Sequence, residues 1–396
     1  MTNPAIVTIA YNRPDSLKRL LHSLEVARFP EGVSVPLVIS IDKSDSDACA
    51  KVAEDFKWTH GEKIIMARKE RMGLKAHVLA CGDLTKEYDN IIVLEDDLVV
   101  SPAFYEYTVK ALDFTEGDKR IGGISLYNHL FNVHARQSFA AIDDGYDNWY
   151  FQLASSWGQA YTKNQWETFM GWYEEHKDKP IGGAFVPANV AGWSEKSWLK
   201  YYIAYLIDTD KYFLYPRVSL TTNFGDVGSH AVKADSDLQV PLAMGEHGKS
   251  YDFVKLEESA SVYDSFFENK VIAKHIGKEM GLSEDEARKS ILTDLYGVKP
   301  VEDEIKSSEG IKYVLSSQVL PYAIIKTYGK QMRPVDANIM YEVEGEEYRL
   351  YDVTKGADRV PHKAVEAVAY LYEYRGISAK QMIEMIKYRI REKFDK

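Results

Sequence analysis

The chain has 396 residues and a mass of 45.1 kDa, a length that predicts two or three domains. Hydrophobic residues make up 45% and charged residues 28%, a composition that excludes a mainly disordered protein. The formal net charge of −11 excludes bulk binding to nucleic acid, because a DNA or RNA backbone is bound through a basic face.

Two cysteines, Cys49 and Cys81, are too few for a disulfide scaffold in a chain of this length, so they favour a reducing compartment. The first apolar run, at 5–10, lacks the charged and long apolar regions of a signal peptide. No run of 18 apolar residues occurs, so no membrane span is predicted. We therefore expect a cytoplasmic protein, either free or peripheral on the inner face of the plasma membrane.

Strand and helix patterns alternate through the first hundred residues. Apolar runs rich in β-branched residues predict strands at 5–10, 36–41, 63–67 and 90–94. Between them, apolar residues at helical spacing predict helices at 16–26, 44–56 and 75–85. Alternation of this kind, with continuous apolar strands, is typical of a parallel sheet covered by helices.

Polar residues stand where three of these strands end. Asn12 and Arg13 follow the first strand, Asp42 follows the second, and Glu95-Asp96-Asp97 closes the fourth. Ligands bind beyond the carboxyl ends of strands in such sheets, so we expect these residues to share one crevice.

The rest of the chain has a different pattern. From 121 to about 267 it is mixed, with Gly, Trp and Tyr scattered through it. Beyond 269 we predict a mainly helical domain, with helices at 287–296, 361–375 and 378–393 and a capping box made by Ser283 and Glu286. The expected domains are therefore 1–268 and 269–396.

Three successive acids, Glu95-Asp96-Asp97, directly follow the apolar run 91–94. Buried together, such acids repel one another and lose hydration. A hard cation such as Mg²⁺ or Mn²⁺ relieves both costs and could bridge to a diphosphate. A solvated acidic turn is the alternative, but the apolar residues on both sides of the triplet argue against it.

The segment 94–104 resembles the metal-binding motif of GT-A glycosyltransferases, in particular N-acetylglucosaminyltransferase I and bacterial family 2-like sugar transferases. Three more segments are similar to the same families in the same order: the opening 6–14, the Trp-Gly segment 155–160 with Trp166, and the closing segment 215–225 with Gly228, Ser229 and His230. The likeness covers residues 4 to about 235. It implies a Rossmann-like GT-A catalytic domain over 1–268, with a donor half at about 1–120 and an acceptor half at about 121–268.

The resemblance also implies roles for single residues. The last acid of the triplet, Asp97, would bind the metal, Mn²⁺ or Mg²⁺, with His230 as a second ligand. The donor would be bound by Ala10, Asn12, Arg13, Asp42, Lys75, Glu95 and Asp96. Arg13 presents a planar fork that suits a diphosphate. Four of these roles have alternatives. Arg13 could be a surface arginine, Asp42 a helix N-cap, and Lys75 part of a solvated basic loop with His77 beside it. His230 could be a structural histidine or could contact the diphosphate.

An inverting transfer needs a carboxylate that takes the proton of the attacking hydroxyl. The resembling family places this acid beside a Trp after the Trp-Gly segment, and Glu195 is the acid of that region here. Alignment on Trp198 puts Ser197 at the family position instead, so Asp143, Asp144 and Asp147 remain competitors for the role. Trp149 and Trp157 are candidate platforms for an acceptor sugar, or core residues.

These inferences predict a metal-dependent, inverting glycosyltransferase that moves a sugar from a nucleotide-sugar to a hydroxyl group. The resemblance favours a UDP-sugar such as UDP-GlcNAc and a glycan or glycolipid acceptor in bacterial surface polysaccharide or glycan synthesis. Two alternatives stay open: a catalytically silent GT-A module that binds glycans or acts as a scaffold, and a nucleotidyltransferase. The helices beyond 269 would form an accessory domain that packs on the core, mediates homo-oligomer formation, or contacts a membrane through a basic terminal helix.

Overall fold

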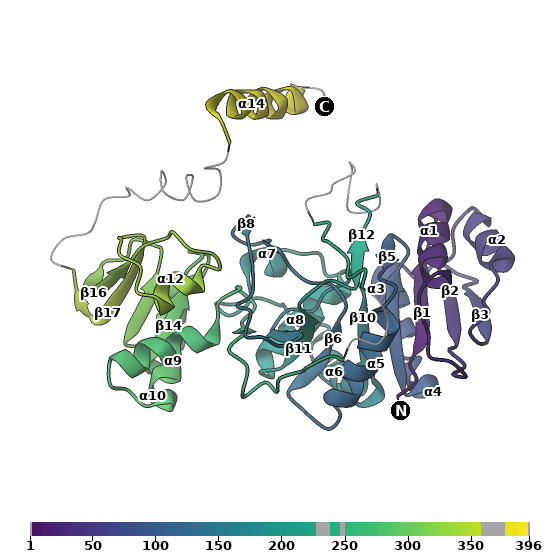
Figure 1. The fold of residues 1–396 in the computed structure, drawn as a ribbon, viewed down its shortest axis with the longest axis horizontal. Coiled ribbons are helices and arrows are strands. Elements are labelled where there is room, and N and C mark those ends of the chain that lie inside the picture. The colour runs from purple at the N-terminus through teal and green to yellow at the C-terminus, as the bar shows by residue number, and fades with distance from the viewer. Residues whose placement is uncertain (1, 227–237, 246–249, 358–376, 395–396) are drawn as a thin grey trace. The chain divides into compact units, whose positions relative to one another are not determined.

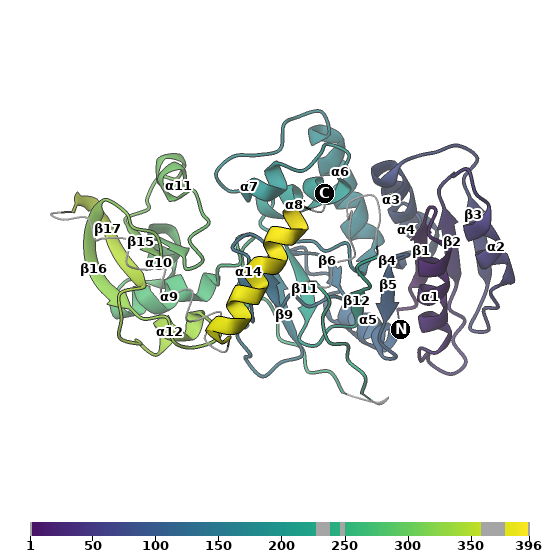
Figure 2. The same cartoon turned by 90° about the horizontal axis from the view of Figure 1, so that it is seen from above.

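The computed structural model describes residues 2–226, 238–245, 250–357 and 377–394. The chain divides into two compact units (Figures 1 and 2). The first comprises Met1–His134, Ala141–Val271 and Val298–Ser307, and the second comprises Ala135–Ala140, Ile272–Gly297 and Ser308–Lys396. No helix in the described ranges is both long enough and apolar enough to cross a bilayer.

The first unit is built on one large sheet. Its strands, in chain order, are β1 (Ala5–Ala10), β2 (Leu37–Ile41), β3 (Lys63–Ala67), β4 (Asn90–Glu95), β6 (Ile121–Ser125), β9 (Asn148–Phe151), β10 (Gln159–Thr162), β11 (Tyr212–Pro216) and β13 (Val262–Tyr263). In space they lie in the order β13-β9-β11-β6-β10-β4-β1-β2-β3. The stretch β4-β1-β2-β3 is parallel throughout, whereas β10 runs antiparallel to both of its neighbours.

Helices cover both faces of this sheet. They are α1 (Pro14–Glu25), α2 (Ala48–Asp55), α3 (Leu74–Gly82), α4 (Thr85–Tyr88), α5 (Phe104–Phe114), α6 (Lys163–His176), α7 (Ala188–Ala191) and α8 (Trp198–Asp208). The first unit also includes α11 (Val301–Ser307). Figure 2 shows α3, α6 and α8 on one side of the sheet and α1 and α5 on the other. The prediction of a mostly parallel sheet flanked by helices is confirmed.

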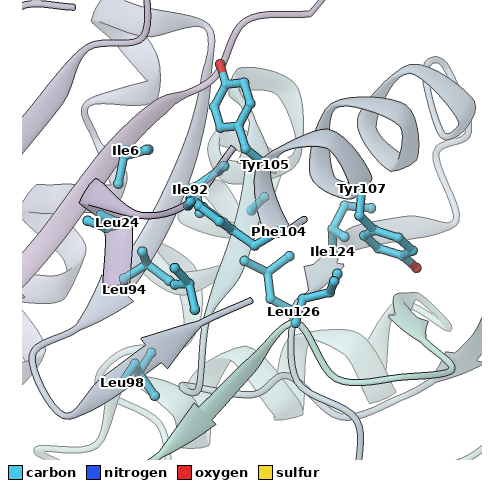
Figure 3. Close-up of a cluster of buried hydrophobic side chains, with 14 of the residues drawn as sticks. Ile6, Leu24, Ile92, Leu94, Leu98, Phe104, Tyr105, Tyr107, Ile124 and Leu126 are labelled. Carbon is cyan, nitrogen blue, oxygen red and sulfur yellow. The ribbon is translucent and has the colours of Figure 1, made fainter. Parts of the chain in front are cut away.

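Apolar burial explains why the predicted elements form. Every residue of β1 is buried, as its continuous apolar run requires. Helix α1 begins at Pro14, which needs no hydrogen-bond partner for its nitrogen, and it buries a leucine stripe that includes Leu24. Figure 3 shows Leu24 in one cluster with Phe104 of α5 and with Ile6 and Ile92, which lie opposite each other on β1 and β4.

Shorter elements complete the first unit. They are β5 (Leu98–Val100), β7 (Phe131–Asn132) and β12 (Thr221–Asn223). Strands β5 and β12 pair antiparallel, with Val100 opposite Thr221 and Leu98 opposite Asn223. This pairing matters for the site because β5 begins directly after the acidic triplet.

The second unit is a mixed α/β structure. It contains β8 (Gln137–Ser138), β14 (Ile291–Asp294), β15 (Tyr313–Ser316), β16 (Tyr322–Tyr328), β17 (Tyr348–Gly356), α10 (Glu284–Ser290), α12 (Asp336–Met340), α14 (Ala379–Phe394) and most of α9 (Lys270–Glu279). Four of its strands form a sheet in the order β14-β15-β17-β16, in which β14 and β15 are parallel and the other pairs antiparallel.

The expectation of a mainly helical region beyond 269 is therefore wrong. The helix predicted at 287–296 ends at Ser290, and the next four residues form the fully buried strand β14. A buried apolar run this short has no period that separates helix from strand. The capping box of Ser283 and Glu286 is present, and the helix predicted at 378–393 is observed as α14. The helix predicted at 361–375 lies outside the described residues.

Candidate active site

The ends of β1, β2 and β4 meet at one edge of the sheet. Parallel pairing places Ile9 opposite both Ser40 and Glu95, so the residues that follow these strands come together. A cavity of about 220 Å³ lies there. Seven residues of the predicted site line it: Ala10, Asn12, Arg13, Asp42, Glu95, Asp96 and Asp97. The expected convergence at the carboxyl ends of the strands is observed.

Arg13 holds the acidic turn together. It occupies the N-cap position of α1, between the end of β1 and Pro14. Its guanidinium donates one hydrogen bond to Asp96 and a second, of 3.1 Å, to Asp97. Burial alone would lower the pKa of Arg13, but the two carboxylates more than offset this and raise it. Arg13 is thus a partly buried cation that lines the cavity, as the predicted diphosphate contact requires.

The triplet holds more negative charge than Arg13 balances. Burial, with repulsion from Asp97 and Asp96, raises the pKa of Glu95 to about 8. Burial also raises the pKa of Asp96 to about 6, against the opposing effect of Arg13. The Oδ1 atom of Asp97 is buried and has no hydrogen-bond partner among the described residues. A buried carboxylate oxygen without a partner is costly, and a bound cation would relieve that cost.

These observations test whether the site suits a divalent metal. No group of three or more His, Cys, Asp or Glu side chains within the described ranges could hold a metal ion by itself. Mg²⁺ is commonly bound through one or two carboxylates together with substrate phosphates and water, so a complete protein cage is not required. The unpartnered oxygen of Asp97 and the excess of acids therefore fit a cation that is shared with a diphosphate ligand.

The backbone around the triplet is fixed from two sides. Phe224, one residue beyond β12, donates its N–H to the carbonyl of Asp97 at 3.0 Å. Asp226 follows closely and lines the cavity. Its carboxylate accepts a 2.7 Å hydrogen bond from Ser16 and forms an ion pair with Arg19, and both residues lie on α1. The Arg19 guanidinium also lies over the Phe224 ring, 3.8 Å from its centre.

Asp42 organises the opposite wall. Its carboxylate accepts backbone N–H groups from Lys43, Met72 and Gly73 at 2.8–2.9 Å. Burial would raise the pKa of Asp42, but these hydrogen bonds lower it overall. Helix α2 begins at Ala48, so Asp42 is not its N-cap. Gly73 has φ of +77°, a conformation that favours glycine, and it turns the chain into α3.

His77 lies at the base of the cavity. It is buried, and its Nε2 atom lies 2.7 Å from the hydroxyl of Ser40. Burial lowers the pKa of His77 to about 4, so the imidazole is neutral at pH 7. Together with Arg71, it presents hydrogen-bonding groups to the same space.

Two predicted residues do not line the cavity. Lys75, near the start of α3, has its ammonium 4.8 Å from the ring centre of Tyr201 and 5.8 Å from that of Tyr173. Glu195 forms a 2.5 Å ion pair with the buried Lys200 and accepts a 2.6 Å hydrogen bond from the Tyr201 hydroxyl. Its side chain is 61% exposed. The hydrogen bonds from Lys200 and Tyr201 lower the pKa of Glu195, so the carboxylate is ionised at neutral pH.

The competing acids have structural partners. Asp144 is paired with Arg217 at 2.6 Å and accepts hydrogen bonds from Ser259 and Ala260. Asp143 accepts the N–H of Gly145, and Asp147 accepts that of Asp252. None of the three acids is among the residues that line the cavity. Ser197, at the expected position of the acid, caps α8.

The remaining predictions have different outcomes. His230 lies outside the described residues, so its role as a metal ligand stays a prediction. Trp149 is fully buried and donates to Asn128 and Pro216, which makes it a core residue. Trp157 is only partly buried and packs on Tyr127.

Sequence reasoning left out several residues that line the cavity. They are Ile9, Tyr11, Arg71, Gly73, Leu74 and Asp226. His77, which the sequence analysis named only as a neighbour of Lys75, also lines the cavity. Arg71 and His77 belong to the basic segment 68–77, in which Lys75 was preferred, and no local signal separates these residues. Asp226 is distant in sequence and reaches the cavity only through Ser16 and Arg19 of α1.

Comparison with known proteins identifies the segment that carries the cavity. The family model described as glycosyl transferase family 2 matches residues 5–171. An alpha-1,3-mannosyl-glycoprotein 2-beta-N-acetylglucosaminyltransferase of Arabidopsis thaliana is 22% identical over 260 residues, which are 61% of this chain and 51% of the relative. The chain thus spans about half the length of this curated relative.

Two solved structures are also similar. Staphylococcus aureus TarS 1-349, in complex with UDP-GlcNAc, has 12% identity and a TM-score of 0.38 over 59% of this chain and 62% of that one. The mannosyltransferase PcManGT from Pyrobaculum calidifontis, in complex with GDP-Man and Mn²⁺, has 14% identity and a TM-score of 0.31 over 42% and 47%. Arg13, Asp42 and the triplet all lie in the segment matched by the family model. The match of residues 5–171 to the glycosyl transferase family 2 model confirms the resemblance of this segment to GT-A glycosyltransferases.

Proposed function

We propose that this protein transfers a sugar from a nucleotide-sugar to a hydroxyl group of a glycan or glycolipid, with inversion and with Mn²⁺ or Mg²⁺ bound. One observation carries the proposal: the buried Oδ1 of Asp97 has no hydrogen-bond partner among the described residues, and it lies in a cavity that Arg13 also lines. A carboxylate ready for a cation, next to a guanidinium suited to phosphate, matches a diphosphate leaving group.

The residues of the cavity would divide the work between them. Asp97 would hold the metal with help from Glu95 and Asp96, and the metal would neutralise charge that develops on the leaving diphosphate. Arg13 would bind the diphosphate from the α1 side. Asp42 would receive the nucleobase, while its hydrogen bonds to Met72 and Gly73 keep the wall of the pocket in place.

The proposal also names a particular donor sugar and a particular catalytic base. The curated relative is named as an N-acetylglucosaminyltransferase, which supports UDP-GlcNAc as the donor. Bacterial surface polysaccharide or glycan synthesis remains the setting we propose. Glu195 remains the proposed base: Lys200 and Tyr201 keep its carboxylate ionised and oriented, as a base must be before it accepts a proton.

A thermal-shift panel with UDP, GDP, dTDP and CMP tests the donor. We expect UDP with Mn²⁺ to raise the unfolding midpoint most, because a ligand that binds only the folded protein stabilises it by mass action. If another nucleotide raises the midpoint more, uracil is the wrong nucleobase for the donor. The proposal of metal-dependent sugar transfer would be unaffected.

Asp97→Asn tests the metal site. We expect nucleotide-sugar hydrolysis with Mn²⁺ to fall by at least about 10²-fold and the metal-dependent part of the thermal shift to disappear. The variant without ligand should unfold no earlier than the wild type, because one of three repelling acids has been neutralised. Asp55→Asn, at the exposed end of α2, makes the same chemical change away from the cavity and should behave as the wild type.

Two outcomes would contradict the proposal. Turnover by Asp97→Asn close to that of the wild type would remove the metal site from the mechanism. A wild-type protein that binds nucleotide but shows no metal-dependent turnover would instead be a silent GT-A module. A nucleotidyltransferase is disfavoured because such enzymes usually have a Gly-rich loop after the first strand, and residues 11–15 contain no glycine.

A further inference from the structure

Helix α14 carries an exposed apolar stripe. Ile383, Ile386 and Ile390 follow one another at spacings of three and four, so they share one face of the helix. Their exposed fractions are 53%, 55% and 51%. Single exposed aliphatic residues occur elsewhere in the chain, such as Val26 and Ile325, but three isoleucines on one helix face form a continuous apolar surface that a partner could cover.

The charges around this stripe follow a pattern. The helix has five basic residues and two acidic ones, although the whole chain has a net charge of −11. At helical spacing, positions 380, 387 and 391 lie along one margin of the stripe and positions 389 and 393 along the other, and all five are Lys or Arg. Of the two acidic positions, 392 falls on the opposite side of the helix, and 384 lies next to the basic margin that contains 387.

This arrangement bears on two of the three partners named in the sequence analysis, a second copy of the chain and a membrane. A second copy of the helix, packed stripe to stripe, would bring basic margins against basic margins, and like charges at that position disfavour pairing. An anionic lipid surface would accept the apolar stripe and attract both margins. Long basic side chains can lie along apolar surface and keep their charged ends at the headgroups.

We propose that α14 binds an anionic lipid surface, with Ile383, Ile386 and Ile390 in the interface and the opposite side of the helix toward water. The helix is not one that could span a bilayer, so it would lie along the surface. Lys387 is in a 2.9 Å ion pair with Glu384, but both side chains are more than half exposed, and such pairs contribute little. Lys387 is therefore free to turn toward lipid. This inference does not rest on sugar transfer.

Vesicle binding of the full chain tests the proposal. We expect the protein to sediment with vesicles of phosphatidylcholine and phosphatidylglycerol, more weakly with pure phosphatidylcholine, and less at high salt. Ile386→Gln should weaken binding by about tenfold or more, because a buried isoleucine would be lost. Lys380→Gln with Lys387→Gln should weaken it by roughly 25-fold, since each basic residue near an anionic surface contributes about fivefold.

Matched variants elsewhere in the second unit serve as controls. Ile325→Gln replaces an isoleucine of β16 that is about equally exposed. Lys289→Gln with Lys355→Gln removes two exposed lysines outside α14. We expect both controls to bind vesicles as the wild type does.

Three results would overturn the proposal. One is equal sedimentation with anionic and neutral vesicles. Another is a loss of vesicle binding in Ile325→Gln as large as the loss in Ile386→Gln. The third combines two observations: light scattering shows a dimer that Ile386→Gln dissociates, and the wild type does not bind vesicles. That result would make a second copy of the chain the partner of α14. Circular dichroism of each variant would confirm that it is folded.

Discussion

At the scale of single residues, the candidate active-site cavity depends on how carboxylates are paired. Asp42 has three backbone donors, whereas the Oδ1 of Asp97 has no partner within the described ranges. The two aspartates therefore differ in role: Asp42 fixes a wall of the cavity, and Asp97 has an oxygen that a ligand could satisfy. The backbone N–H groups around Asp42 make the difference, because a buried carboxylate oxygen without a partner is costly unless a ligand satisfies it.

Glu195→Gln tests the assignment of the base. We expect kcat to fall by about 10²-fold or more with little change in donor affinity, because the amide cannot take the acceptor proton. Tyr201→Phe should cost much less, since it removes one hydrogen bond and leaves the carboxylate in place. Glu174→Gln, which disrupts an exposed ion pair with Lys177, is the matched control.

Equal effects of Glu195→Gln and Tyr201→Phe would mean that Glu195 only positions its neighbours. Normal kcat in Glu195→Gln would exclude it as the base and move the search to Asp143, Asp144 and Asp147.

His129 carries a prediction about pH. Its ring is buried among those of Tyr127, Phe151 and Trp157, and neither ring nitrogen has a hydrogen-bond partner among the described residues. Burial lowers the pKa of His129 to about 3. In the unfolded chain it is about 6.5, so below pH 6.5 the unfolded state binds more protons, and stability is lost as the pH falls toward 3.

His129→Phe should therefore flatten the acid side of the stability profile. We expect the free energy of unfolding to rise by about 1–3 kcal/mol at pH 7. The loss between pH 7 and pH 5 should shrink by roughly 2 kcal/mol. All seven tryptophans belong to the first unit, so fluorescence during urea unfolding reports on it. An unchanged pH profile would show that His129 is not held neutral, and the exposed His22→Gln serves as control.

At the scale of elements, the Trp-Gly segment supports the turn that holds the triplet. Gly158 has φ of +91°, and a Cβ atom there would lie 2.7 Å from Cγ2 of Thr221. The Thr221 hydroxyl donates to the carbonyl of Trp157 at 2.5 Å. Thr221 also pairs with Val100 on β5, which follows the triplet. The glycine is therefore needed for close approach between three segments, whatever the acceptor is.

Gly158→Ala should destabilise the first unit and weaken donor binding together. Gly117 has φ of +77° but open space around it, so Gly117→Ala isolates the backbone strain, about 1–2 kcal/mol. We expect Gly158→Ala to cost roughly 1–3 kcal/mol more, from the clash with Thr221, in urea unfolding followed by fluorescence. Equal costs in the two variants would show that β12 moves freely and does not support the triplet.

At the scale of the whole molecule, the chain leaves the first unit and comes back to it. Residues 298–307 belong to the first unit, although 272–297 and 308–396 belong to the second. The returning segment brings the buried Lys299, whose ammonium pairs with Asp264 at 2.6 Å. Burial would lower the pKa of Lys299, but the nearby acids more than offset this and raise it. We propose that donor chemistry lies within 1–268, yet a fragment that ends at 268 would lack this lysine.

Lys299→Met tests how much the returning segment contributes. It keeps the length of the side chain and removes the charge, so buried acids lose their cation, and we expect a loss of about 3–5 kcal/mol in the first unit. Lys289→Met breaks an exposed pair with Asp285 and should cost less than about 1 kcal/mol. If both variants unfold alike, the segment 298–307 is not held by Lys299, and truncation at 268 becomes harmless.

The sequence by itself determined the donor half of the fold. Short apolar runs between turn residues predicted the strands of this half, and the predicted bounds 5–10 and 63–67 are those observed for β1 and β3. Parallel pairing then forces residues at strand ends to meet, which is why Arg13, Asp42 and Asp97 could be placed in one cavity from spacing alone. These inferences depend on local pattern and on one general rule of sheet geometry.

Only the tertiary structure decided the rest. Lys75 and Arg71 belong to one basic segment, and the local sequence does not tell which of them faces the cavity. Asp226 reaches that cavity because α1, more than two hundred residues earlier, supplies Ser16 and Arg19 as its partners. The strand 291–294 forms because β15 is there to pair with it. In each case the deciding contact joins residues far apart in the chain, and local periodicity carries no information about such contacts.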